Sequence, residues 1–171
     1  IKDASDIAEQ TLRRIRLISY DLRPPELDTL GLNEALEAYC EEFAQRTRLT
    51  IRYEGVELPG LIDAIRISLY RFLQEGLTNV VKHAEANAVD VRLSYDGQEV
   101  CLTISDDGRG FVVPARVGAN NASLGLGLLG MKERLAQLGG SLTIQSRLRE
   151  GTDLIACAPW EGPSLREGPS P

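Results

Sequence analysis

Long hydrophobic runs are missing from this chain of 171 residues. No apolar stretch approaches the ~20 residues that a membrane-spanning helix needs, and no signal peptide is recognisable at the start. Because the only methionine is Met131 and residue 1 is Ile, we expect the chain to be part of a longer protein, which could be anchored in the inner membrane. We expect this segment to be cytoplasmic and to make no direct membrane contact.

Basic residues are scarce as well. The chain has 19 Lys and Arg against 25 Asp and Glu, a net charge of −6, and it has no basic tract, which disfavours nucleic acid as a partner. An acidic protein that binds phosphates must create positive potential locally, from Mg²⁺, helix N-termini and a few lysines. With 43% hydrophobic residues, the chain can bury one good core.

Cysteines are few and do not form a recognisable framework. Cys40, Cys101 and Cys157 are odd in number, are scattered, and include no CxxC pair. Each lies within an apolar run. This pattern predicts reduced thiols in the core of a cytosolic protein.

The first 22 residues have the pattern of an amphipathic helix, and Arg23-Pro24-Pro25 ends it. Such a helix needs a partner for its apolar stripe, so we expect it to pair with a helix outside this chain or with a second copy. We therefore predict three parts. They are a helix over residues 1–24, a folded domain over 25–160 and a disordered tail over 161–171, which is rich in Pro and Gly.

Two helices and a short strand are predicted in the first half of the folded domain. The first helix runs from Leu32 to Arg46, the strand alternates over Thr50 to Glu54, and the longest helical pattern extends from Leu61 to about Ala86. Two hairpins follow. One turns at Asp96-Gly97, and the other pairs 142–144 with 154–158. Because only one face of each strand is apolar, we predict an α+β fold, a two-layer sandwich with a mixed or antiparallel sheet covered on one face by helices.

Polar residues recur along the longest helix at positions that share one face. Glu75, Asn79, Lys82 and His83 are spaced i, i+4, i+7 and i+8. The Asn79 amide oxygen is a candidate Mg²⁺ ligand, Glu75 could orient or deprotonate an attacking group, and Lys82 and His83 could meet phosphate oxygens. A solvated helix face is the alternative interpretation of the same spacing.

Two glycine clusters mark the ends of regular elements. Asp106-Asp107-Gly108-Arg109-Gly110-Phe111 follows an alternating strand pattern, and Gly125-Leu126-Gly127-Leu128-Leu129-Gly130 precedes a helix start at Met131. Glycine lets the backbone approach a ligand closely, and free N–H groups at a helix start favour a phosphate. The pattern indicates a nucleotide between the two clusters. The polar loop from Phe111 to Ser123 would be its lid.

Taken together and in order, these motifs resemble a known family. The set Glu75-x3-Asn79-x2-Lys82-His83, Asp106-x-Gly108-x-Gly110, Gly125-x-Gly127-x2-Gly130 and Gly151-Thr152 looks like the ATP-binding domain of sensor histidine kinases, the Bergerat fold shared with gyrase, Hsp90 and MutL. The match extends over about 30–160. The upstream segment from Asp21 to Leu32 is similar to the subfamily of the nitrate and membrane-fluidity sensors, where it joins the dimerisation domain to the ATPase domain.

The resemblance implies a role for each matching residue. Asp106 would accept a hydrogen bond from the adenine amino group, with Thr152 in support, while Asn79 would hold Mg²⁺. Glu75 would help to activate the phosphate-accepting group, and Asp107 stands where the family often has Asn. The remaining positions would surround the nucleotide and its phosphates: Lys82, His83, Gly108, Gly110, Gly125, Leu126, Gly127, Leu128 and Gly130.

The implied reaction transfers the γ-phosphoryl of Mg-ATP to a histidine on an upstream helix, for relay to an aspartate of a response regulator by a homodimeric parent. His83 is followed by Ala84 within the nucleotide-binding helix, so we do not expect it to be the acceptor, and the isolated chain should not autophosphorylate. The alternative is a nucleotide-binding interaction module, degenerate or of the anti-sigma type. An ATP-driven clamp is disfavoured by the short lid and the acidic surface.

Overall fold

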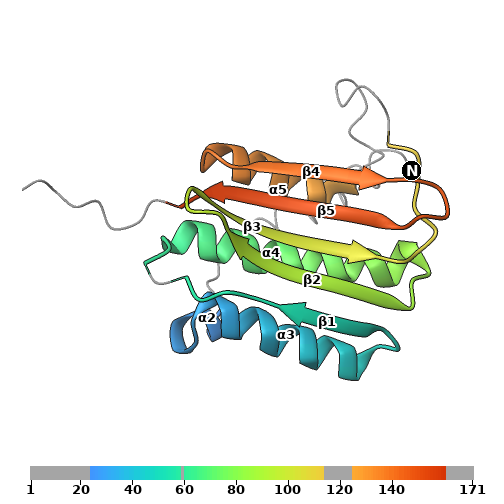
Figure 1. Cartoon of the computed structure of the whole chain (residues 1–171), viewed down its shortest axis with the longest axis horizontal. Helices are drawn as coiled ribbons and strands as arrows, with labels where there is room; N and C mark the ends of the chain where they lie inside the picture. Colours follow the sequence, from blue (N-terminus) through green and yellow to red (C-terminus); the bar gives the residue numbers. More distant parts are fainter. Residues whose placement is uncertain (1–23, 59, 114–124, 161–171) are drawn as a thin grey trace, which may run out of the picture.

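The fold is built on one mixed sheet (Figure 1). The computed structural model describes residues 24–58, 60–113 and 125–160, so the predicted helix over 1–22, the tail over 161–171 and most of the predicted lid lie outside the described residues. The sheet has the order β1-β2-β3-β5-β4, in which β1 pairs parallel with β2 and the other neighbours pair antiparallel. Its strands are β1 Thr50–Glu54, β2 Ala88–Tyr95, β3 Glu99–Asp106, β4 Ser141–Ser146 and β5 Thr152–Pro159.

Helices cover one face of this sheet, and the opposite face is turned toward the viewer in Figure 1. They are α2 Glu26–Thr29, α3 Leu32–Arg46, α4 Asp63–Asn79, the π-helix η1 Val80–Ala84 and α5 Gly125–Gln137. The layers confirm the predicted α+β sandwich. The short α2 was not predicted from the sequence.

The core lies between the two layers because the strands alternate. Val89, Val91 and Leu93 of β2 are each 1% exposed, whereas the residues between them face the other side. From the helix layer, Phe72 and Leu73 of α4 are fully buried against the sheet. Complete burial of one such side chain stabilises a fold by about 1.5–3 kcal/mol. The alternation therefore fixes which face of each strand meets the helices.

Turn chemistry sets the ends of two elements, of which the hairpin turn at Asp96-Gly97 was predicted from the sequence. At the β2–β3 hairpin, the Asp96 carboxylate accepts hydrogen bonds from the amides of Gln98 and Glu99, both at 2.9 Å. At the end of α5, the Gly140 amide reaches the Leu135 carbonyl at 2.8 Å while Gly139 adopts a φ of +75°. This second pattern is a Schellman motif, which requires a left-handed residue after the helix.

The longest helix differs from the prediction of one regular α-helix over Leu61–Ala86. It begins at Asp63, and after Asn79 it widens into the π-helical turn η1, which ends where Glu85 adopts a φ of +55°. The amide of Arg109 donates to the Ala84 carbonyl at 2.8 Å and ties this end to the loop after β3. A π-helical turn changes the angular position of the following side chains by a fraction of a turn, which periodicity in the sequence cannot reveal.

The second glycine cluster also differs from its prediction. We expected the helix to begin at Met131, but α5 begins at Gly125, so the glycines lie inside its first turns. The reason is an apolar stripe that continues through the cluster. Leu128, Met131 and Leu135 follow at helical spacing and are 8%, 4% and 1% exposed. Burial of this stripe outweighs the cost of about 1 kcal/mol per helical glycine.

The prediction of three reduced core thiols was wrong for two of the cysteines. Cys40 is free and buried, but Cys101 and Cys157 form a disulfide. They lie directly opposite each other on β3 and β5, on the face away from the helices. The alternation of Val100 and Leu102 around Cys101 contained the signal for that face, but the pairing of the two strands does not follow from the sequence.

Candidate functional site

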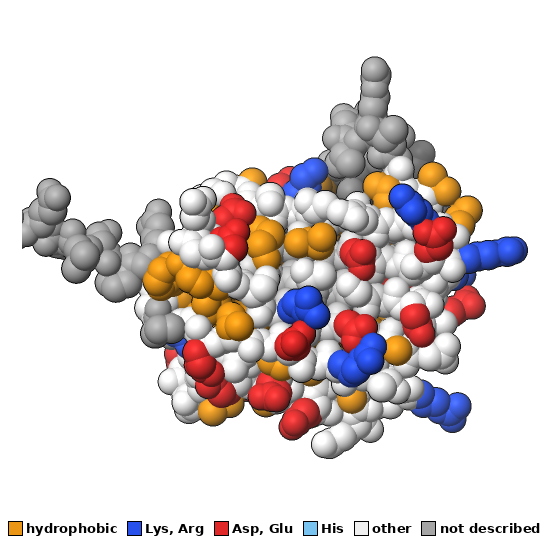
Figure 2. Space-filling model, viewed as in Figure 1, with side chains coloured by type: hydrophobic (Ala, Val, Ile, Leu, Met, Phe, Trp, Pro, Cys, Tyr) orange, Lys and Arg blue, Asp and Glu red, His pale blue; other side chains and the backbone are white. Residues whose placement is uncertain are grey.

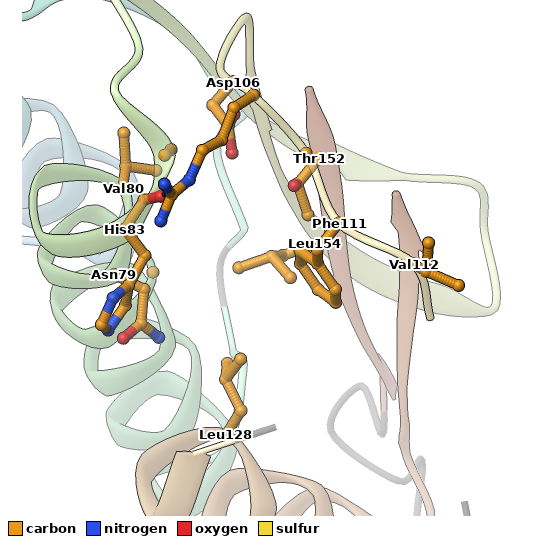
Figure 3. A pocket seen from close by; sticks show the side chains of 13 residues that line it. Asn79, Val80, His83, Asp106, Phe111, Val112, Leu128, Thr152 and Leu154 are labelled. Carbon is orange, nitrogen blue, oxygen red and sulfur yellow. Dashed lines mark hydrogen bonds between the residues drawn. The ribbon is translucent and has the colours of Figure 1, made fainter. Parts of the chain in front are cut away.

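A cavity of about 530 Å³ opens between α4, η1 and α5 on one side and the ends of β3 and β5 on the other. In Figure 3, Asn79, Val80 and His83 project from the helix, Asp106 and Thr152 lie near each other on the strands, and Leu128 closes one side from α5. Pockets of about 300–1,000 Å³ that combine apolar walls with a few polar groups are typical of small-molecule sites. The described lining is Gly76, Asn79, Val80, His83, Ala84, Asp106, Arg109, Gly110, Phe111, Val112, Leu128, Thr152 and Leu154.

Asp106 is the half-buried carboxylate of this cavity. One of its oxygens accepts a hydrogen bond from the Gly108 amide at 2.9 Å. Burial raises the pKa of the Asp106 carboxyl, the neighbouring charges of Asp107 and Asp153 raise it further, and the Gly108 amide opposes this by lowering it. A carboxylate held partly out of water in a cavity is a strong acceptor for a ligand donor.

Thr152 opens β5 directly opposite Asp106 in the sheet register and is 8% exposed. Its hydroxyl lies 2.9 Å from the Ser146 hydroxyl, which also donates to the Gly151 carbonyl at 3.0 Å and accepts from the Phe111 amide at 2.9 Å. Because the single proton of Ser146 is used toward Gly151, the Thr152 hydroxyl must be the donor in the bond between them. The Thr152 oxygen, on a residue that lines the cavity, therefore keeps lone pairs that can accept a hydrogen bond.

The glycines of the first cluster allow the loop after β3 to pass between two other backbones. A Cβ at Gly108 would lie 2.4 Å from the Ala84 carbonyl oxygen, and a Cβ at Gly110 would lie 1.9 Å from that of Arg147. Gly110 also has a φ of +56°, in the left-handed region that glycine tolerates best. These two positions bring the loop close to both the π-helical turn and the β4–β5 turn. Gly110 lines the cavity, and Gly108 lies beside Asp106 outside the lining.

Asp107 does not line the cavity, although it is next to Asp106 in sequence. Its carboxylate accepts hydrogen bonds from the amides of Asn87 and Ala88, at 2.8 and 3.0 Å. The bond from the Ala88 amide, and to a smaller degree that from the Asn87 amide, lowers the pKa of the exposed Asp107 carboxyl. The carboxylate at this position, where the resembling family often has Asn, therefore has a structural use at the start of β2.

The residues of the polar face predicted on the longest helix do not all reach the cavity. Asn79 and His83 line the cavity, whereas Glu75 and the exposed Lys82 are outside its lining. The Glu75 carboxylate instead lies against α5, where a Cβ at Gly127 would come within 1.9 Å of it. Gly125 and Leu126 belong to the first turn of α5, and Leu128 reaches the cavity from the next turn. The structure thus brings together Asn79, His83, Asp106, Gly110, Leu128 and Thr152.

Sequence reasoning missed part of the cavity wall. Val80 and Leu154 look like ordinary core residues in a periodic pattern, whereas the two wall residues Phe111 and Val112 begin the segment that was predicted as a lid. Ser146, which orients Thr152, is separated from it only by a turn and had no visible signal. Arg109, placed between the two glycines of the first cluster, was the one missed residue whose position in a motif could have drawn attention.

Comparisons with known proteins match the chain to one family. Residues 64–162 match the family model described as "Histidine kinase-, DNA gyrase B-, and HSP90-like ATPase". The chain is 40% identical over 152 residues to the sensor histidine kinase MctS of Rhizobium johnstonii, covering 86% of this chain and 32% of that protein. It is 32% identical over 163 residues to the histidine-protein kinase/phosphatase DegS of Brevibacillus brevis, covering 93% of this chain and 40% of that protein. The chain thus spans about a third to two fifths of these relatives.

A solved structure shares the fold. The histidine kinase domain of the blue-light activated histidine kinase EL346 of Erythrobacter litoralis superposes with a TM-score of 0.62 at 21% identity, covering 75% of this chain and 61% of that one. At this identity the likeness concerns the fold alone. Among the residues that the structure describes, no helix combines the length and the apolar character needed to cross a bilayer.

Proposed function

Because this chain belongs to the family of histidine kinase-, DNA gyrase B- and HSP90-like ATPases, we propose that it is the ATP-binding catalytic part of a sensor histidine kinase. In this proposal, Mg-ATP binds in the cavity and its γ-phosphoryl group passes to a histidine on an upstream helix. The cavity residue that carries the proposal is Asp106, because its carboxylate lies beside the Thr152 hydroxyl among apolar walls.

Two adjacent acceptors favour one purine over the other. The Thr152 hydroxyl is committed as a donor to Ser146, so Asp106 and Thr152 both offer lone pairs. Adenine presents an amino donor at the position where guanine presents a carbonyl oxygen, and two facing acceptors repel. Val80, Leu154 and Leu128 provide apolar surface for a flat ring. We therefore propose adenine as the base, held by Asp106 directly and by Thr152 through water.

The phosphate side of the proposed site lies toward η1 and α5. The donor set there fits a hard cation, because the Asn79 amide reaches the cavity and its oxygen is the type of ligand that Mg²⁺ accepts. When bound, Mg²⁺ would neutralise charge on the phosphates. His83 and the first turns of α5 would contact phosphate oxygens. The exposed Lys82 side chain would lie nearby. Glu75, held one turn before Asn79, would act on the phosphate-accepting group once the acceptor helix docks.

Parts outside this cavity complete the proposed reaction. Residues 1–24 would be the last helix of a dimerisation domain, 25–160 the catalytic domain and 161–171 a tail. The parent would act as a homodimer, would transfer the phosphoryl group to the receiver domain of a response regulator, and would keep this domain in the cytoplasm. His83 is the only histidine of the chain and lies in the proposed nucleotide site, so incubation with labelled ATP should leave no acid-labile phosphate on this chain alone.

Titration calorimetry with ATP, with and without Mg²⁺, tests the nucleotide site. Asp106→Asn should abolish measurable ATP binding, because it replaces one acceptor oxygen with an NH₂ donor and removes the charge. Asn79→Ala should leave nucleotide binding but remove its dependence on Mg²⁺. Asp107→Asn is the matched control, since this neighbouring carboxylate bonds to the Asn87 and Ala88 amides instead of lining the cavity. We expect it to bind like the wild type.

The result that would overturn the site is Asp106→Asn binding ATP as tightly as the wild type while Asp107→Asn also binds. Circular dichroism of each variant separates a lost site from a lost fold. Guanine nucleotides supply a second comparison. If GTP competes as well as ATP, the argument from paired acceptors fails even though a nucleotide cavity remains.

A further inference from the structure

The open face of the sheet, which the described helices leave uncovered, is the face shown in Figure 2. Uncharged polar surface and mixed charges make up much of it, and two exposed ion pairs, Arg52–Asp90 and Arg92–Glu54, bridge β1 and β2. Farther along the sheet, the strand register aligns four small side chains across β2, β3, β5 and β4. They form what we call the serine–cysteine row: Ser94, Cys101, Cys157 and Ser141.

The two cysteines of this row meet because of register and alternation. Cys101 lies directly opposite Cys157, with their Cα atoms 4.1 Å apart, and the two are joined by a disulfide. Their strand neighbours Val100, Leu102 and Ala156 are 0% exposed in the core, so the cysteines point to the other face. Both are partly exposed there.

The neighbours of the two cysteines within the row are small. An attacking thiolate must approach one sulfur along the line of the sulfur–sulfur bond. The strand register places Ser94 next to Cys101 and Ser141 next to Cys157, so a small side chain flanks the disulfide on each side. Serine is among the smallest side chains, and Ser141 is exposed. Two small neighbours and two partly exposed cysteines together favour the approach of a small thiol to the disulfide.

The third cysteine has the opposite environment. Cys40 is 3% exposed within α3, and burial, with the charges of Glu37 and Glu41, raises the pKa of its thiol to about 12. Because the thiolate is the reactive form, Cys40 is inert at neutral pH in the folded protein. Redox chemistry on the described cysteines is thus confined to the open face.

We propose that Cys101 and Cys157 form a reversible dithiol–disulfide site that exchanges with low-molecular-weight thiols while the domain stays folded. In reduction, a small thiolate bonds to one sulfur and breaks the Cys101–Cys157 bond, releasing the other sulfur as a thiolate. A second small thiol then attacks the mixed disulfide. Overall, the protein disulfide and two small thiols give two protein thiols and one small-molecule disulfide, and oxidation is the reverse.

A carboxylate beside the pair sets its rate. A carboxylate oxygen of Glu99 and the two sulfur atoms all lie within 4.8 Å of one another. This negative charge repels an approaching thiolate, and the exposed position makes the effect sensitive to salt. Glu99→Gln should therefore speed exchange by about two- to fourfold at low ionic strength, and the difference should fade near ~1 M salt.

The test uses the whole chain in graded mixtures of reduced and oxidised glutathione with a chelator, followed by acid quenching and a mass-tagging thiol reagent. We expect Cys101 and Cys157 to gain tags together as the mixture becomes reducing, while circular dichroism stays native. Cys40 should take a tag only after denaturation. If the two cysteines become reactive only when the chain unfolds, or if the reduced pair never closes, the proposal is wrong.

Single substitutions give a second readout. With Cys101→Ser or Cys157→Ser, no resolving thiol remains, so oxidised glutathione should leave one stable adduct of one glutathione per chain. The wild type should form the same mixed disulfide only transiently, because its second cysteine displaces the glutathione. Persistent glutathione adducts on the wild type would overturn the proposed exchange, even if both thiols are accessible.

Discussion

At the scale of single residues, glycine has two different uses in this chain. Gly110 combines a φ of +56° with a backbone contact that an added Cβ would violate, whereas nothing lies within 4 Å of a Cβ at the exposed Gly130 of α5. The first position needs glycine for the close passage of the loop. The second is a helical position where glycine is unfavourable.

Gly110→Ala should therefore destabilise the domain by about 1–3 kcal/mol, from left-handed strain and the clash with the Arg147 carbonyl. Gly130→Ala is its control and should raise the free energy of unfolding by about 0.5–1 kcal/mol. Urea unfolding of both variants measures these changes. A Gly110→Ala variant as stable as the wild type would show that the loop does not need its described path.

The adjacent carboxylates Asp106 and Asp107 should respond oppositely to pH. The folded-state pKa of Asp106 lies above its ordinary value of 3.8, so ionised Asp106 lowers stability above that folded-state pKa, and the penalty disappears as pH falls below 3.8. The folded-state pKa of Asp107 lies below 3.8, so its stabilisation is complete above 3.8 and is lost as pH falls through the folded-state value.

Substitution by Asn isolates these charges. Without nucleotide, Asp106→Asn should be more stable than the wild type at pH 7 and Asp107→Asn less stable. Both differences should shrink as the pH is lowered from 5 toward 3. Urea unfolding across this range checks the signs. Two variants that shift stability in the same direction at pH 7 would contradict the assigned environments.

At the scale of elements, the sequence predicted most of the sheet and helices but not the local geometry of the site. The strand Thr50–Glu54, the helix Leu32–Arg46 and both hairpins follow from alternation, helical spacing and turn residues, and the structure confirms them. These signals are local. The π-helical turn, the start of α5 and the Cys101–Cys157 pair depend on packing and register, which involve residues far apart in the chain.

The candidate site shows the same division. Asp106 and Gly110 could be predicted because both belong to one short sequence motif. Asn79 could be predicted because its helical spacing and its amide oxygen suit a cation ligand. That His83 lines the cavity while Lys82 does not could not be predicted, since both lie in the wider π-helical turn after Asn79. Ser146 orients Thr152 through a contact across the β4–β5 turn, and only the folded chain brings the two hydroxyls together.

The π-helical turn and the loop after β3 are coupled by one side chain. Arg109 Nε donates to the His83 carbonyl at 2.7 Å, and its Nη1 donates to the Glu85 carboxylate at 3.1 Å. This fork fixes η1 relative to the loop that carries Asp106 and Gly110. It connects two elements that the proposed nucleotide would contact at once.

Arg109→Ala should weaken ATP binding about three- to tenfold, because a loss of about 1 kcal/mol of positioning changes Kd by that factor. The exposed ion pair itself should contribute about 1 kcal/mol or less to stability. Arg92→Ala, which removes an exposed pair with Glu54 on the open face, is the control and should not change ATP affinity. Calorimetry that finds equal affinities for all three proteins would remove the proposed coupling.

At the scale of the whole molecule, one strand ladder serves both faces of the sheet. The pairing of β3 with β5 sets Asp106 opposite Thr152 at one end, on the cavity, and Cys101 opposite Cys157 five positions away in each strand, on the open face. An odd separation along a strand reverses the face. The same pair of strands can therefore carry the disulfide on the open face and the cavity residues on the opposite face, so the disulfide does not take up space in the cavity.

The cross-link should act on global stability mainly through the unfolded chain. It joins residues 56 apart in sequence, and closing a loop of that size in the unfolded state is worth about 4 kcal/mol in the chain-entropy model. Reduction should therefore lower the urea midpoint of the wild type and, because the unfolded state becomes more expanded, increase the dependence of the unfolding free energy on urea. The double variant Cys101→Ala, Cys157→Ala should unfold identically with and without reductant. Suppose that the stability of the wild type is also unaffected by the reductant, although mass tagging shows both thiols free. The folded β3–β5 pairing must then relax on reduction by an amount that offsets the lost constraint. Hydrogen exchange of β3 and β5 would locate that relaxation.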